Sequence, residues 1–158
     1  MVNPYPYFGY SPNMANYALF GPNRGVYDKY TKITYTNMFD AMMDALYSAM
    51  KNIGYSDVEM VIGETGWPTN CDYVACSTNN AATFHRNLVW HVNSGKGTPL
   101  MPNRKFETYL FALFNENLKP GPTAERNWGL FYPDFTPVYD VPNIMIGGRV
   151  SLYTSISF

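Results

Sequence analysis

Residues 58–68 read Val58-Glu59-Met60-Val61-Ile62-Gly63-Glu64-Thr65-Gly66-Trp67-Pro68, a nearly continuous apolar run followed by a carboxylate and a tight turn. Such a run is typical of a β-strand that is covered on both faces, as in a parallel sheet. Glycine and proline after residue 64 mark the end of the strand. We therefore predict a buried strand over residues 58–64, with Glu64 at its carboxyl end.

A helix is predicted on the amino-terminal side of this strand. Apolar residues within 38–53 recur at positions i, i+3, i+4 and i+7, which is the spacing of one helical face. Asn37 can cap the first turn, and Gly54 can end the last one. Residues 9–36 are rich in Gly, Pro, Asn and Tyr without a helical period. We predict a long loop there, and loops of that length are often functional.

A second helix and two further strands complete an alternating order. Asn79 or Asn80 can cap a helix that ends near Gly95. Residues 106–114 are again apolar and predict a strand, whereas residues 2–8 contain two prolines and suit a strand end that turns into a loop. The order strand, helix, strand, helix, strand implies parallel strands joined by crossover helices, and hence an α/β fold.

The composition excludes several classes of partner. The chain has 158 residues, with 11 Lys and Arg against 12 Asp and Glu, so it offers no basic surface for nucleic acid or an anionic membrane. No apolar run reaches the roughly 18 residues of a membrane-spanning helix. Aromatic residues make up 17% of the chain and charged residues only 15%. Such flat apolar side chains with polar tips can bind sugars or peptides, or can simply fill a core.

The cysteines and histidines do not predict a metal site. Cys71 and Cys76 share one polar loop, where they can form a disulfide or remain two thiols. No histidine or further cysteine has the spacing that completes a zinc site. His85 and His91 are expected on different faces of one helix, which argues against shared ligation.

Polar and aromatic residues follow each of the three predicted strands. In parallel α/β folds the loops at the carboxyl ends of the strands converge, and chemistry collects there. The residues at these ends are Asn3, Tyr5, Tyr7 and Phe8; Glu64, Thr65, Gly66 and Trp67; and Asn115, Glu116, Asn117 and Lys119. Two carboxylates beside aromatic residues and a lysine fit acid/base or nucleophilic catalysis on a neutral polar substrate such as a sugar. Alternatively, Glu64 and Glu116 only cap loops or pair with Lys119 and Arg126.

Four segments of the chain resemble one known family. They are Val2-Asn3-Pro4-Tyr5-Pro6-Tyr7-Phe8, Gly63-Glu64-Thr65-Gly66-Trp67-Pro68, Phe114-Asn115-Glu116-Asn117 and Glu125-Arg126-Asn127-Trp128-Gly129-Leu130-Phe131. In this order and spacing they resemble the C-terminal half of plant endo-β-1,3-glucanases, which are retaining glycoside hydrolases with a (β/α)8 TIM barrel. The resemblance implies that residues 1–141 contain strands six to eight of such a barrel. It leaves residues 142–158 as an unmatched C-terminal extension.

The resemblance also implies a role for each matched residue. Glu64 would be the nucleophile, because attack by a carboxylate on the anomeric carbon forms an ester that water can hydrolyse. Glu116, Lys119 and Glu125 would support the site, and the positive Lys119 would favour the ionised carboxylates. The cleft-lining residues would be Asn3, Tyr5, Phe8, Trp67 and Asn115. For Trp67, packing beneath the loop beside Pro68 is the alternative. The family resemblance implies no cofactor and no metal.

The chain also departs from the family pattern. The acid/base glutamate, which in the family follows Gly-Asn at the end of strand four, has no counterpart here, and a complete barrel needs roughly 250 residues. Three interpretations therefore stay open: the C-terminal half of a β-1,3-glucan hydrolase, an inactive glucan-binding remnant, or a partial chain that associates through its open sheet edges. The expected glucan is callose or a fungal wall polymer. The family implies a secreted, extracellular or cell-wall location, although the start of the chain lacks the features of a secretory signal.

Overall fold

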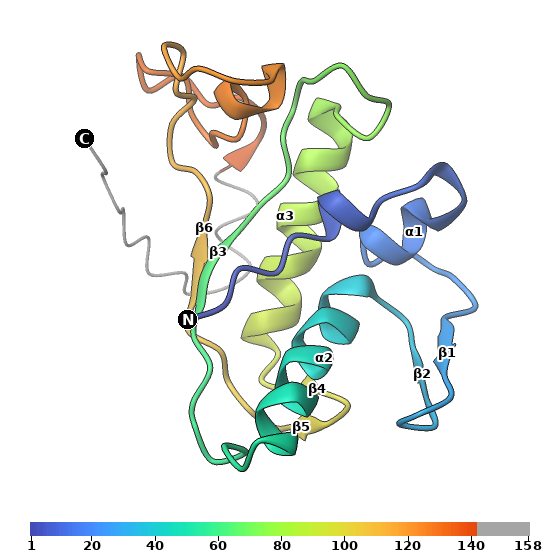
Figure 1. The fold of residues 1–158 in the computed structure, drawn as a ribbon. Coiled ribbons are helices and arrows are strands. Elements are labelled where there is room, and N and C mark those ends of the chain that lie inside the picture. Colours follow the sequence, from blue (N-terminus) through green and yellow to red (C-terminus); the bar gives the residue numbers. More distant parts are fainter. Residues whose placement is uncertain (142–158) are drawn as a thin grey trace.

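The computed structural model describes residues 1–141, and the predicted extension at residues 142–158 lies outside the described residues. Strand β3 (Ile62–Thr65) pairs in parallel with β6 (Thr108–Leu110), and Val2 forms a parallel bridge to Ile62 on β3. Figure 1 shows β3 beside β6, with helices α2 and α3 on one side of them. The predicted parallel order of the three β segments is confirmed.

Both predicted strands are shorter than the apolar runs that indicated them. The run that begins at Val58 becomes a strand only at Ile62, and the run over residues 106–114 is a strand only over 108–110. Val58 is 45% exposed, whereas Ile62 is completely buried. The apolar run therefore starts outside the core and enters it only where the neighbouring strand begins to pair.

Helix α2 (Met38–Asn52) begins and ends where the sequence predicts. The Asn37 side chain accepts a hydrogen bond from the backbone N–H of Asp40 at 2.7 Å, which satisfies one of the free donors of the first turn. Gly54 follows the helix with a φ of +90°, a conformation that residues with a Cβ rarely adopt. The inward face carries Phe39 and Met43, both fully buried.

Helix α3 (Thr78–Asn93) has a different cap from the predicted one. Ser77 accepts a hydrogen bond from the backbone N–H of Asn80 at 3.0 Å, so the helix starts before Asn79 and Asn80. The side chain of Asn80 instead donates to the carbonyl of Ala75. The inward face of the helix carries Phe84 and Leu88, both fully buried.

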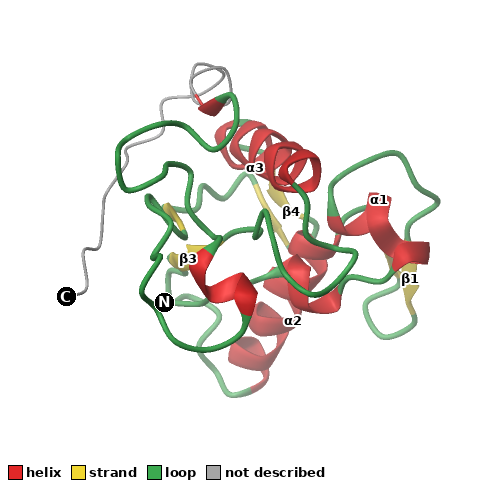
Figure 2. Ribbon diagram, turned by 90° about the horizontal axis from the view of Figure 1, so that it is seen from above, coloured by secondary structure: helices red, strands yellow, loops and turns green. Residues whose placement is uncertain are grey.

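Residues 9–36 contain more structure than the predicted loop. They fold into α1 (Ala15–Ala18) and an antiparallel hairpin of β1 (Val26–Asp28) and β2 (Ile33–Tyr35). Elements of three or four residues are too short to produce a detectable period, which is why the sequence shows none. A second small hairpin, which was not predicted, consists of β4 (Gly97–Thr98) and β5 (Met101–Pro102). Figure 2 shows the helices and loops from above.

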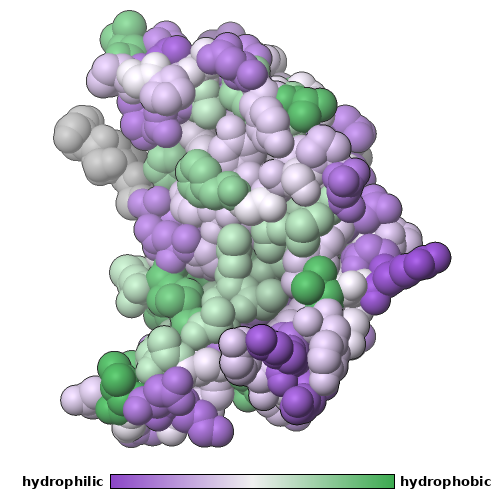
Figure 3. Space-filling view, turned by 45° about the vertical axis from the view of Figure 1, so that its right-hand side comes forward, coloured by the Kyte–Doolittle hydropathy of each residue, from purple (hydrophilic) through white to green (hydrophobic). Residues whose placement is uncertain are grey.

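The core lies between the two long helices and the strands. Its largest fully buried side chains include Trp67, Phe39, Phe84, Met43 and Ile62. On the face drawn in Figure 3, apolar residues gather in a central area with hydrophilic residues around it. Within residues 1–141, no helix combines the length and apolarity that crossing a membrane requires.

Candidate active site

The first two strand ends meet at Glu64. The hydroxyl of Tyr5 donates a hydrogen bond to Glu64 Oε2 at 3.0 Å, and Tyr5 follows the parallel bridge of Val2 to β3. Burial of the ring, and then the negative charge of Glu64, raise the pKa of Tyr5 well above its ordinary value. The hydroxyl therefore stays protonated and remains a hydrogen-bond donor to the carboxylate.

The third strand end carries a group of three charges. Lys119 Nζ lies 3.1 Å from Glu116 Oε2 and 3.1 Å from Glu125 Oε2. Partial burial by itself lowers the pKa of Lys119, but the hydrogen bonds to both carboxylates outweigh it and the net shift is upward. The ammonium is thus held in its charged form between two carboxylates. It also lies 4.9 Å from the ring centre of Phe111, on the strand side of the site.

Glu116 and Arg126 have different partners. Glu116 pairs with Lys119, a contact that both the supporting role and the non-catalytic interpretation include. Arg126 instead donates to the backbone carbonyls of Lys119 and Gly121 at 2.9 Å and 3.0 Å, and so fixes the turn that carries Lys119.

Trp128 connects the strand ends and was assigned no role from the sequence. Its ring lies 5.3 Å from Tyr5, 5.3 Å from Tyr7 and 6.0 Å from Phe111 between centroids, all edge to face. Only 4% of Trp128 is exposed. The indole therefore serves as the common base under residues from the first and third strand ends. In the sequence, the only indication of such a role was that Trp128 lies in residues 125–131, one of the four segments that resemble the family.

Two predicted cleft residues are buried and serve the fold. Trp67 is fully buried, donates its indole N–H to the carbonyl of Ala75 at 2.9 Å, and contacts the rings of Tyr7 and Tyr10. The expectation that Trp67 lines the cleft is thus wrong for this structure, and the packing alternative holds. Asn115 is 7% exposed and accepts a hydrogen bond from Gly129 N at 2.8 Å, which holds two loops together. Its predicted contact with substrate stays a prediction, because 7% of the residue is still exposed.

The other predicted cleft residues are accessible. Asn3 and Phe8 are exposed, and Phe8 reaches 72% exposure although it is a large apolar side chain. The Phe8 ring lies 5.6 Å from that of Tyr5, edge to face. An exposed aromatic side chain therefore stands next to the tyrosine that contacts Glu64.

Cys71 and Cys76 form a disulfide, with a Cα–Cα distance of 5.6 Å. The hydroxyl of Tyr7 lies 3.5 Å from Cys71 Sγ, and Thr123 donates to Asp72 at 3.2 Å. The disulfide loop thus contacts both the first strand end and the turn that contains Glu125. Within residues 1–141, no three His, Cys, Asp or Glu side chains are grouped so that they could hold a metal ion.

Comparison with known proteins identifies relatives over almost the whole chain. The sequence model of glycosyl hydrolases family 17 matches residues 1–143. A glucan endo-1,3-beta-glucosidase of Triticum aestivum is 57% identical over 96% of this chain, and glucan endo-1,3-beta-glucosidase 7 of Arabidopsis thaliana is 49% identical over 89%. The chain spans only 33% and 29% of the lengths of these two relatives.

Solved structures place the same residues in a known fold. CJP38, a beta-1,3-glucanase and allergen of Cryptomeria japonica pollen, superposes with a TM-score of 0.80 at 45% identity, over 96% of this chain and 45% of that one. A plant beta-glucan endohydrolase gives 0.75 at 41% identity, over 87% of this chain and 44% of that one. The parallel strands with their crossover helices are therefore part of a TIM barrel. With its family match covering residues 1–143, the chain belongs to glycosyl hydrolases family 17.

Proposed function

We propose that the chain carries the nucleophile of a retaining site that hydrolyses internal β-1,3-glucosidic bonds in glucans, and that Glu64 is this nucleophile. The observation that carries the proposal is the position of Glu64 in β3, next to the strand's carboxyl end, with its carboxylate hydrogen-bonded to Tyr5. In a TIM barrel, this end of the strands is where catalytic residues collect. The names of the relatives supply the substrate class.

In this mechanism the Glu64 carboxylate attacks the anomeric carbon, and the glucosidic C–O bond breaks. The departing glucan oxygen takes a proton from a general acid, and the glucosyl unit stays on Glu64 as an ester. Water then attacks the same carbon, the acid residue in its deprotonated form accepts the proton, and Glu64 is released as a carboxylate.

Glu116 and Glu125 have a supporting role in this proposal. Each is tied to Lys119 at 3.1 Å, so the three side chains neutralise much of one another's charge. A general acid has to be protonated in the attacking complex, whereas a nearby ammonium favours the ionised carboxylate. We therefore assign the acid/base role to neither of them. Phe8 and Asn3 are proposed to contact the glucan, with the Phe8 ring packed on the apolar face of a glucose unit.

The test uses a substrate that needs no general acid. A 2,4-dinitrophenyl β-laminaribioside has a leaving group that departs without protonation, so the first step, which releases dinitrophenolate, depends on the nucleophile alone. The purified chain should release dinitrophenolate, and Glu64→Gln should reduce the rate by at least about 10³-fold, as expected for loss of a nucleophile.

The matched control is Glu59→Gln, the same substitution at an exposed residue before β3. It should release dinitrophenolate at the wild-type rate. Equal rates for wild type and Glu64→Gln would overturn the assignment of the nucleophile. A wild-type chain that binds laminarin but releases no dinitrophenolate would instead support a glucan-binding role without catalysis.

A further inference from the structure

A pocket lies outside the candidate active site. It has a volume of about 530 Å³ and is lined by residues 20–23, the start of α2 and the end of α3 with the loop after it. This volume is within the range of about 300–1,000 Å³ found for small-molecule sites. None of its lining residues belongs to the group around Glu64 and Lys119.

An exposed tryptophan forms one wall of this pocket. Trp90 is 62% exposed, whereas Trp67 and Trp128 are 0% and 4% exposed. The ammonium of Lys96, another lining residue, lies 5.6 Å from the centre of the Trp90 ring. A flat apolar surface and a hydrogen-bond donor therefore stand side by side at the mouth.

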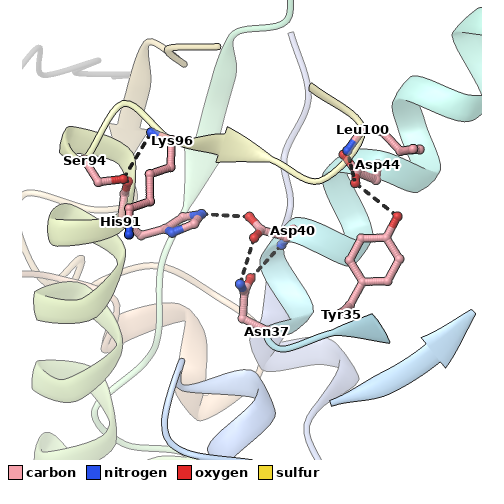
Figure 4. Close-up of polar contacts among 8 residues, drawn as sticks. All are labelled: Tyr35, Asn37, Asp40, Asp44, His91, Ser94, Lys96 and Leu100. Carbon is pink, nitrogen blue, oxygen red and sulfur yellow. Dashed lines mark hydrogen bonds and ion pairs between the residues drawn. The ribbon is translucent and has the colours of Figure 1, made fainter. Parts of the chain in front are cut away.

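The pocket also has a polar wall that the fold holds in place. Asp40 is 7% exposed, and its two oxygens are bound by His91 Nε2 at 2.7 Å and by Asn37 Nδ2 at 2.8 Å (Figure 4). These three side chains come from α3 and from the first turn of α2, so the wall connects the two helices. Because its partners are in contact with it, Asp40 does not need a ligand to satisfy its charge.

Other polar atoms of the lining are not used by the fold. Asn87 donates a hydrogen bond from Nδ2 to the carbonyl of Leu19. Its side-chain oxygen has no partner among residues 1–141 and remains available as an acceptor. Within residues 1–141 the ammonium of Lys96 contacts only the Trp90 ring, so its three hydrogens remain available as donors. The formal charges of Lys96 and Asp40 cancel, so the pocket favours an uncharged ligand that both donates and accepts hydrogen bonds.

We propose that this pocket is a second saccharide-binding site, which takes a neutral pyranose oligosaccharide against Trp90. A pyranose ring has a flat apolar face, which suits the indole, and hydroxyl groups that both donate and accept, which suit Asn87 and Lys96. The site recognises the sugar without reacting with it. It does not depend on Glu64 being a nucleophile, because none of its residues contacts that carboxylate.

The emission of Trp90 provides a direct test on the whole chain. Of the three tryptophans, only Trp90 is accessible to iodide, so iodide quenching reports on this residue. Laminaritriose and cellotriose should each protect it in a saturable manner. Sorbitol, a flexible polyol without an apolar ring face, and trigalacturonate, an anionic saccharide, should not. The same titrations with Glu64→Gln should give the same protection even though hydrolysis is lost, which separates this proposal from the previous one.

Variants locate the site that gives the signal. Asn87→Ala and Lys96→Ala should each weaken protection by about three- to tenfold, the effect of losing one hydrogen bond. Phe8→Ala, which changes the candidate active site, should leave the protection intact. Trp90→Ala removes the fluorescent reporter, so laminaritriose binding to this variant is measured by calorimetry. The binding heat from this site should disappear. A cooperative thermal unfolding transition shows that each variant is folded.

Several outcomes would overturn the proposal. The first is that laminaritriose or cellotriose fails to protect Trp90 from iodide. The second is that trigalacturonate protects it more strongly than these neutral trisaccharides do. The third is loss of protection in Phe8→Ala, which would place the signal in the active site. Equal affinity in Asn87→Ala, Lys96→Ala and wild type would likewise contradict the assigned contacts.

Discussion

Two residues stabilise the carboxylates of the candidate active site by different means. Tyr5 offers a neutral hydroxyl to Glu64 and keeps its proton because its pKa is raised by burial and by that carboxylate. Lys119 offers a full positive charge, but to Glu116 and Glu125. The proposed nucleophile therefore has a hydrogen-bond donor beside it, whereas the ion-paired group of two carboxylates and one ammonium lies at the next strand end.

Replacing the lysine tests this division of roles. Lys119→Met removes both ion pairs, and we expect dinitrophenolate release to fall on the order of tenfold, less than the loss of a donor that acts directly on the reacting atoms. Since Lys119 is partly exposed, the free energy of unfolding should change by less than about 1 kcal/mol. Lys105→Met, at an exposed position, is the control. A large loss of stability with an unchanged rate would show that Lys119 is only structural.

His85 gives the chain a predicted sensitivity to acid. It is fully buried, with Nδ1 2.8 Å from the carbonyl of Ala81 and 2.8 Å from the hydroxyl of Tyr139. Burial lowers the pKa of His85 from 6.5 to about 4, against a smaller opposing effect of the Ala81 hydrogen bond. Between these two values the unfolded chain binds a proton that the folded chain excludes, so stability decreases as the pH falls.

The effect can be isolated with one variant. Between pH 6.5 and pH 4, the wild type should lose about 3 kcal/mol of unfolding free energy through His85, in addition to the changes due to the carboxylates. His85→Gln cannot take up this proton, so its curve of unfolding free energy against pH should be flatter over that window. Parallel curves in urea titrations of the two proteins would contradict the assignment.

At the scale of the elements, the two long helices have N-caps that differ in one respect. Ser77 only caps α3, whereas Asn37 caps α2 and also donates to Asp40, the residue that contacts His91 on α3. Asn37 therefore supports both the start of one helix and the connection between two helices.

A pair of matched substitutions separates these contributions. Ser77→Ala should lower the free energy of unfolding by about 1 kcal/mol, the usual effect of losing a cap. Asn37→Ala should cost more, roughly 2 kcal/mol, because the buried Asp40 also loses a hydrogen bond. Urea denaturation of both variants measures the difference. Equal losses would show that the Asn37 to Asp40 side-chain bond contributes nothing.

The sequence predicted the long elements better than the short ones. The helical period, Asn37 and Gly54 located α2, and the apolar runs located β3 and β6 in the correct parallel order. The β1–β2 hairpin was not predicted, because its strands are too short to produce a pattern. The cap of α3 was predicted at Asn79 or Asn80, because both are common cap residues, whereas the actual cap is Ser77.

The same limit applies to the candidate active site. Strand order is enough to bring Tyr5 to the same edge as Glu64, and the structure has that contact. Spacing along the chain does not predict the direction of a side chain that follows a strand, because that direction depends on the neighbouring loops. Trp67 points into the core, where its indole N–H donates to the carbonyl of Ala75 in the disulfide loop. The position of Trp128 beneath both strand ends follows from the packing of its segment against Tyr5 and Phe111, which spacing along the chain does not reveal.

At the scale of the molecule, the disulfide loop links parts of the candidate active site that are far apart in sequence. Through Tyr7 it contacts the first strand end, and through Thr123 it contacts the turn that holds Glu125. The loop thus connects the aromatic and the charged sides of the site.

Removing the disulfide should therefore affect both stability and the site. In Cys71→Ser with Cys76→Ser, we expect a loss of about 2 kcal/mol from the entropy of the short closed loop. Dinitrophenolate release should fall several-fold as the loop loses its fixed position. Wild-type protein treated with reductant should behave in the same way. An unchanged unfolding midpoint in urea would show that packing alone holds the loop.

The central claim is that Glu64 forms a covalent bond with the sugar. It is tested most directly with 2-deoxy-2-fluoro-β-laminaribiosyl fluoride, whose fluoride leaves without a general acid and whose 2-fluoro group slows hydrolysis of the ester. Mass spectrometry should show one laminaribiosyl unit added to the chain, and peptide mapping should place it on Glu64. A label on Glu116 or Glu125, or a chain that stays unlabelled at saturating reagent, would contradict the claim.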